Sequence, residues 1–173
     1  MDLAILRLIH IGAGVFWVGA FYAFFLFVQP TAMSVGPAGQ QFMYGLLHHR
    51  RFSVILLASA ITTVLAGIWL LWLTSDGLRL DLLFDISRLG FTMGGIAAIL
   101  TLGVGASYVF PRTRIIERVL GGFIAEGRPP NDEERAQLMK VGSESRAAGR
   151  LVVIGLAIAV LCMATARYWG VFL

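Results

Sequence analysis

The chain has 173 residues, of which 58% are hydrophobic and 14% are charged, whereas about 25% are charged in soluble domains. A single cysteine, Cys162, excludes an internal disulfide framework and a cysteine-rich zinc or iron–sulfur site. The formal net charge of +4 would suit nucleic acid, but the basic residues stand beside long apolar runs. We therefore expect contacts with anionic membrane lipid and no nucleic-acid partner.

Four apolar segments are long enough to cross a membrane. The first, 3–28, would be about 39 Å long as a helix, enough for a hydrocarbon core of about 30 Å with some tilt. Its length and the acidic residue Asp2 are unlike a signal peptide, so we expect it to remain in the mature protein. The other expected spans are 52–73, 90–110 and 151–169. These segments predict an all-α fold, a polytopic four-helix bundle that forms one domain over 1–173.

Small side chains recur every four residues in two of the spans, which is typical of faces where membrane helices approach closely. The second span offers two such faces, and the third span offers one. The three sets are Ala58, Thr62 and Ala66; Ser59, Thr63 and Gly67; and Gly90, Gly94 and Ala98.

The connections between the spans differ in character. Segment 31–44 is rich in Gly, Pro, Ser and Gln and predicts a loop, and 74–89 predicts a surface loop with a short amphipathic piece. Segment 111–150 holds most of the charge. Apolar residues at helical spacing after Pro111 predict that the third helix continues beyond the membrane. Asn131, followed by three acidic residues, predicts the N-terminus of a helix that runs on into the fourth span.

The distribution of basic residues predicts the orientation. Ten of the 14 Lys and Arg residues belong to the connections 29–51 and 111–150, and four lie on the other side. The positive-inside rule then places 111–150 in the cytoplasm and both termini outside, in the inner membrane of a bacterium. Aromatic residues expected at the outer interface agree with this orientation; they are Trp69, Trp72, Tyr168 and Trp169.

One histidine, His10, stands about 10 Å inside the first span from the predicted outer surface. Met93, Cys162 and Met163 stand at a similar depth in the third and fourth spans, so the sequence permits one cluster of His10, Met93 and either Met163 or Cys162. Imidazole and thioether are ligands of haem iron, and with a thiol they also suit copper(I). Arg7, one turn nearer the surface, is suited to a haem propionate.

Packing roles compete with these ligand roles. An intramembrane histidine can simply bond a neighbouring helix, and methionines commonly fill gaps. His48 and His49 adjoin Arg50 and Arg51 at the opposite membrane boundary, where we expect contact with lipid headgroups.

Two stretches carry a family resemblance, which covers about the first 75 residues. LRLIHIGAGVFWVGAFYAFF and RRFSVILLASAITTVLAGIWLL resemble the first and second helices of the copper-resistance protein D superfamily and of its relative, the membrane-embedded protoporphyrinogen oxidase of bacteria. The resemblance implies that His10 is a haem b ligand. The oxidase family also has a functional lysine near the start of the third helix; here that stretch reads RLGFTMGG, with Met93 near that place and no lysine.

Three functions stay open from the sequence. The first is b-type haem binding at His10 with a role in electron transfer or haem-linked redox chemistry, which requires a redox partner. The second is copper handling by His10 with a methionine or thiol. The third is a cofactor-free accessory subunit that packs into a larger membrane complex.

Overall fold

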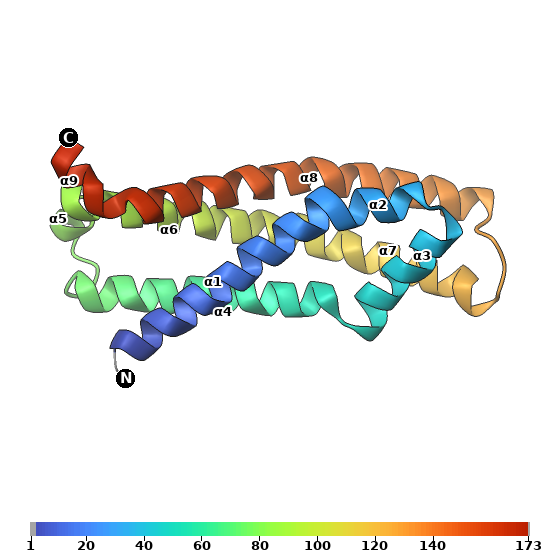
Figure 1. The fold of residues 1–173 in the computed structure, drawn as a ribbon, viewed down its shortest axis with the longest axis horizontal. Coiled ribbons are helices and arrows are strands. Elements are labelled where there is room, and N and C mark those ends of the chain that lie inside the picture. Colours follow the sequence, from blue (N-terminus) through green and yellow to red (C-terminus); the bar gives the residue numbers. More distant parts are fainter. Residues whose placement is uncertain (1–2, 173) are drawn as a thin grey trace.

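The computed structural model describes residues 3–172, apart from the side chains of residues 87, 171 and 172. Most of the described residues are helical and none forms a strand, and four helices are long and apolar enough to cross a membrane. They lie side by side as an elongated bundle (Figure 1). The predicted all-α polytopic bundle is thereby confirmed.

Several of the long helices are divided by short turns of different pitch. In chain order the elements are α1 (Leu3–Ala23), η1 (Phe24–Val28), α2 (Gln29–Ser34), α3 (Pro37–Tyr44), η2 (Gly45–His49), α4 (Phe52–Thr74), α5 (Leu80–Leu83), α6 (Ile86–Val104), η3 (Gly105–Val109), α7 (Phe110–Ala125), α8 (Asp132–Thr165), η4 (Ala166–Tyr168) and α9 (Trp169–Phe172). The α1–α2 and α6–α7 segments are continuous helices, so the third span does continue as a helix beyond its apolar part.

The prediction of a loop at 31–44 is wrong, because most of this segment is helical. Helix α2 carries the first span on to Ser34, and α3 begins at Pro37 after a turn at Gly36, whose φ is 63°. A proline inside a helix clashes with the carbonyl four residues earlier. Here Pro30 follows the π-helical turn η1, in which the Gln29 N–H donates to the Phe24 carbonyl, and the wider turn accommodates the proline ring. The same arrangement recurs at η3 and Pro111.

The bundle consists of two helix pairs, because α1 packs mainly on α4 and α6 packs mainly on α8. Small residues mediate both contacts: a Cβ on Gly14 would lie 3.2 Å from Thr63 Cγ2, and one on Gly90 would lie 2.7 Å from Ala166 Cα. The Gly90–Gly94 face is therefore a packing face, as predicted. On α4 it is the face with Thr63 and Gly67 that meets α1, whereas Ala58 and Thr62 are exposed.

The two pairs meet through contacts of α4 with α6, of α3 with α7 and of α1 with α8, and α1, α4 and α8 come together near the middle of the bundle. The buried core there comprises Trp17, Phe21, Ala60, Val152 and Leu156. Gly149 lets η1 approach α8, because a Cβ at that position would overlap the Phe25 ring. The bundle is thus joined near its middle and again where α3 packs on α7, whereas the two pairs diverge towards the end with the two termini (Figure 1).

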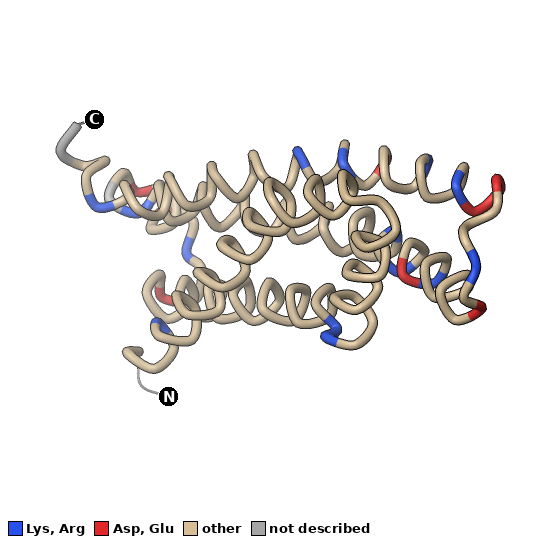
Figure 2. Tube along the Cα trace, turned by 45° about the vertical axis from the view of Figure 1, so that its right-hand side comes forward, with Lys and Arg blue, Asp and Glu red and all other residues tan. Residues whose placement is uncertain are grey.

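Both termini lie at one end of the bundle, which we call the termini end, and the α7–α8 connection lies at the other, the loop end (Figure 1). Charged residues gather towards the ends of the bundle, and the loop end carries a charged extension of α7 and α8 (Figure 2). There Arg112 Nε donates to Glu144 at 2.9 Å, and Arg128 Nη2 donates to Glu134 at 2.7 Å. These contacts join the two extensions to each other and to their connection.

Helix α8 begins with the capping box that the sequence predicts. The Asn131 side chain accepts from the Glu134 N–H, and the Glu134 carboxylate accepts from the Asn131 N–H, each at 2.8 Å. Glu134 lies outside the apolar part of α8. Its bonds from Arg128, and then from Asn131, lower the pKa of its carboxyl to about 2.

Candidate functional site

His10 links the first two spans. Its Nδ1 lies 2.8 Å from the backbone carbonyl oxygen of Thr63 on α4. A carbonyl oxygen can only accept, so Nδ1 carries a proton and donates it, and in the neutral ring Nε2 is then the nitrogen with the lone pair. The histidine therefore satisfies one ring nitrogen within the fold and retains the other as a ligand or acceptor.

Gly67 makes room for the imidazole. A Cβ added at Gly67 would lie 2.8 Å from His10 Cε1 and 3.0 Å from Nδ1, closer than real Cβ contacts. The ring thus lies directly against the backbone of α4, one helical turn after the carbonyl that it bonds. Gly67 and the Thr63 carbonyl together fix the position and the tautomer of His10.

Arg7 lies one turn before His10 on α1. Its side chain is exposed, and it makes no hydrogen bond or ion pair with the described residues. The guanidinium is therefore free for an anionic group at this level of the helix.

The three predicted sulfur ligands lie in the other helix pair. A Cβ on Gly94 of α6 would lie 2.7 Å from Met163 Cγ and 3.4 Å from Cys162 Cβ, so both residues of α8 pack at this glycine. Met93, next to it in the chain, is 45% exposed. The structure brings Met163 and Cys162 to one helix contact at Gly94, whereas His10 lies in the α1–α4 contact. Among the described residues, no three His, Cys, Asp or Glu side chains gather to hold a metal ion.

His48 does not simply face the headgroups, as the sequence suggested. Its Nδ1 lies 3.0 Å from Glu117 Oε1 on α7, and its ring stacks on Tyr44 with centroids 5.0 Å apart. Arg114 also donates to Glu117, at 2.8 Å. The exposed His48 therefore ties η2 to the α7 extension.

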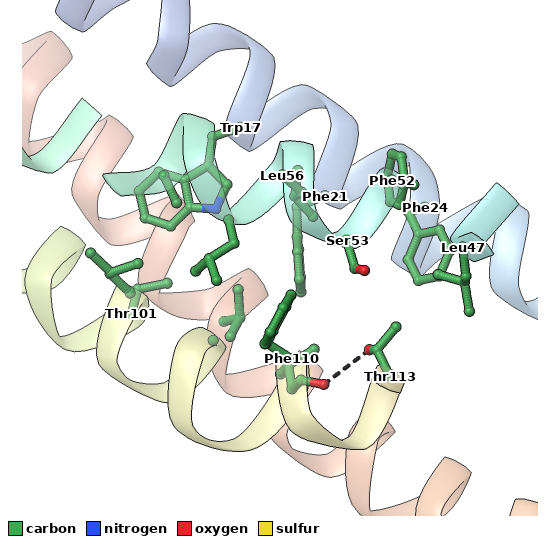
Figure 3. A pocket seen from close by; sticks show the side chains of 16 residues that line it. Trp17, Phe21, Phe24, Leu47, Phe52, Ser53, Leu56, Thr101, Phe110 and Thr113 are labelled. Atoms are coloured by element: carbon green, nitrogen blue, oxygen red, sulfur yellow. Dashed lines mark hydrogen bonds between the residues drawn. The ribbon is translucent and has the colours of Figure 1, made fainter. Parts of the chain in front are cut away.

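An apolar cleft lies between the four spans, in the half of the bundle nearer the loop end, and sequence reasoning missed it. Its cavity volume is about 60 Å³. Aromatic rings line much of it, as Figure 3 shows, and Ser53 and Thr113 contribute hydroxyls. The lining residues are Trp17, Phe21, Phe24, Leu47, Phe52, Ser53, Leu56, Leu57, Ala60, Thr101, Leu102, Gly105, Val109, Phe110, Thr113 and Val152.

No sequence pattern predicts this cleft, because its lining residues come from all four spans and each of them is a residue type that commonly packs inside a helix bundle. The relevant signal is a single polar residue near the start of α4, Ser53, whose hydroxyl oxygen has no hydrogen-bond partner in the described part of the chain. That property depends on the surroundings of the residue and not on its identity.

The fold and these contacts define an integral membrane protein with four spanning helices, a histidine held between two of them and a small apolar cleft. Searches for similar proteins found no matching family model, no matching curated protein and no matching solved structure.

Proposed function

We propose that this membrane protein binds a b-type haem through His10 Nε2 and acts in electron transfer or haem-linked redox chemistry. The observation that carries the proposal is the bond from His10 Nδ1 to the Thr63 carbonyl. Histidines that ligate metals typically donate their other ring N–H to a carbonyl or carboxylate, which orients the ring and makes it a better donor. The resemblance of the first two spans to haem-binding membrane proteins supports the same role.

The residues present fit one bond to haem iron and one contact to a haem carboxylate. His10 would offer Nε2, and the Arg7 guanidinium, which pairs with no described residue, would suit a propionate. Met93, Met163 and Cys162 lie in the other helix pair, so His10 would be the iron ligand at this level of the α1–α4 contact. A bound haem supplies a one-electron carrier; Thr63 and Gly67 hold the imidazole in place, and Arg7 balances negative charge.

The orientation belongs to the proposal. We place the loop end in the bacterial cytoplasm and His10 towards the outer face of the inner membrane, where a redox partner would exchange electrons with it.

Visible absorption of the purified protein tests this function. We expect a Soret band in the native chain and its loss in His10→Gln, which keeps an N–H donor for the Thr63 carbonyl but removes the imidazole. His49→Ala, at an exposed histidine of the loop end, is the matched control and keeps the band. A folded protein that takes up no haem, or a band unchanged in His10→Gln, refutes the proposal.

The second candidate is copper handling, favoured by the approach of Cys162 and Met163 to the same glycine of α6. Thiol and thioether are soft donors that select copper(I). A colourless protein that binds copper stoichiometrically, and loses it in Cys162→Ser, would support this candidate. A protein without haem or copper that co-purifies with other membrane subunits would support the accessory-subunit function.

A further inference from the structure

The arginines of the loop end differ in their partners. Three of them pair with acids of the charged extension: Arg112 with Glu144, Arg114 with Glu117 and Arg128 with Glu134. Arg146 and Arg150 stand where the apolar part of α8 begins, and they form no ion pair with a described residue. These two cations are therefore available to an anion from outside the chain.

Arg146 and Arg150 lie one turn apart on the same side of α8, where residues four apart are neighbours. Long side chains on a helix lean towards its N-terminus. Arg146 does so, because its Nη1 lies 4.0 Å from the position that a Cβ on Gly142 would take. Arg150 is exposed and Arg146 is half-buried, so the two side chains present one basic surface.

Met33 holds the Arg146 side chain without cancelling its charge. Arg146 Nη1 donates to Met33 Sδ at 3.2 Å, which joins α8 to α2. A thioether is an uncharged and weak acceptor, so the guanidinium keeps its full positive charge. Its other N–H groups have no acceptor among the described residues. A fixed guanidinium with free N–H groups is well suited to the oxygens of a phosphate.

An exposed apolar stripe leads from Arg150 along α8 towards the termini end. It consists of Ile154, Ile158 and Leu161, which follow at intervals of three or four residues and so lie on the same side of the helix. Their side chains are 56%, 48% and 63% exposed. In a membrane this stripe contacts acyl chains, which places Arg146 and Arg150 at the depth of the lipid phosphates.

We propose that Arg146 and Arg150 bind the phosphate of an anionic glycerophospholipid in the leaflet on the loop-end side, with its acyl chains along the apolar stripe. Charge complementarity favours an anionic lipid, because the ammonium of a zwitterionic headgroup already balances its phosphate. The site shares no residue with His10 or Arg7, so it goes beyond the proposed haem function and can fail or succeed separately from it.

A fluorescent reporter, Ile154→Trp, is introduced beside the site, and the exposed or half-buried tryptophans Trp69, Trp72 and Trp169 are replaced by Phe. The full chain is placed in phosphatidylcholine vesicles. Phosphatidylglycerol or phosphatidylcholine with brominated acyl chains, which quench tryptophan on contact, is then added in increasing fraction. The same chain with Ile154 intact gives the signal of the buried Trp17, which is subtracted. Both leaflets hold the same lipids, so the result does not depend on the orientation of the protein.

We expect half-maximal quenching of the reporter at an about ten-fold lower fraction of brominated phosphatidylglycerol than of brominated phosphatidylcholine. Arg150→Gln should reduce this preference about five-fold, since one cationic contact is lost, and the double variant with Arg146→Gln should abolish it. Lys140→Gln is the matched control. It removes the same charge from α8 about 15 Å before Arg150, beyond the screening length of about 8 Å, and should keep the preference.

Three results would overturn the proposal. Equal quenching by the two brominated lipids means that no anionic lipid is selected. An equal loss of preference in Lys140→Gln and Arg150→Gln means that only the general surface charge attracts the lipid. Inorganic phosphate that abolishes the preference at constant ionic strength means that the arginines take a soluble anion. Haem absorption, measured on the same preparations, reports on His10 independently.

Discussion

At the scale of single residues, polar side chains inside the spans are held by backbone carbonyls of neighbouring helices or of their own helix. His10 bonds the carbonyl of Thr63, and Tyr22 donates to the carbonyl of Val153 on α8 at 2.8 Å. In lipid no water competes for these donors, so each finds a partner within the protein. Two residues depart from this rule: the Ser53 hydroxyl and the Arg7 guanidinium have no hydrogen-bond partner among the described residues.

Gly67→Ala should destabilise the α1–α4 pair. The new Cβ would lie 2.8 Å from the His10 ring, so the imidazole must move and its bond to Thr63 must weaken. We expect a loss of about 1 to 3 kcal/mol in the free energy of unfolding, measured by denaturation in detergent.

Gly12→Ala is the matched control, since a Cβ there meets nothing within 4 Å and alanine favours the helix. Equal unfolding midpoints for Gly67→Ala and Gly12→Ala would show that the imidazole does not rest on Gly67.

At the scale of elements, the long helices differ from simple spans in two ways. The first and third contain a π-helical turn two residues before a proline, which lets each helix continue past that proline. The fourth, α8, starts well outside its apolar part at a capping box. Local signals at Asn131 therefore decide where the charged extension begins.

Asn131→Ala should loosen the first turn of α8. The Glu134 N–H would lose its acceptor, at a cost of about 1 kcal/mol in helix stability. Hydrogen exchange of the amides at 132–135 should accelerate, while exchange in the apolar part of α8 stays unchanged. Asn131→Asp keeps a side-chain oxygen that accepts from the Glu134 N–H, so its amides should exchange at the rate of the parent. Equally fast amide exchange in both variants would contradict the role of the cap.

At the scale of the whole molecule, an even number of spans brings both termini to one end, with the α7–α8 connection at the other. The charges of the loop end form a separate layer of ion pairs between α7, α8 and their connection (Figure 2). This division into an apolar half and a charged extension fits a protein that is anchored in lipid and presents a polar surface on one side.

A topology experiment tests this arrangement and its orientation together. A reporter inserted after Gly127 should be active on the cytoplasmic side, and one fused after Leu173, just outside the described residues, should be active on the external side. Reporters on the same side would contradict the four-span bundle. A reporter active outside after Gly127 and inside after Leu173 would agree with the four-span bundle but reverse its orientation, which would place His10 in the cytoplasmic half of the membrane.

The candidate site was only partly predictable from the sequence. The depth of His10 in its span and its separation from the charged end follow from counting residues along the helix. The hydrogen-bond partner of the His10 ring does not follow from such counting. Thr63 and Ala66 are equally plausible small-residue contacts until the face of α4 that meets α1 is known. Counting residues also placed Met93, Cys162 and Met163 at its depth, but depth along the membrane leaves the position around the bundle undetermined.

By itself the sequence determined the number of spans, the helical fold class, the capped start of α8 and the greater number of charged residues at the loop end. These features depend on local hydropathy, spacing and charge. Tertiary structure alone decided that α1 pairs with α4 and α6 with α8, that His10 bonds Thr63, and that Ser53 faces an apolar cleft. The physical reason is that lipid and protein interior are equally apolar. A hydrophobic side chain is therefore equally stable in both environments, and only the packing of complementary helix surfaces decides whether it contacts lipid or another helix.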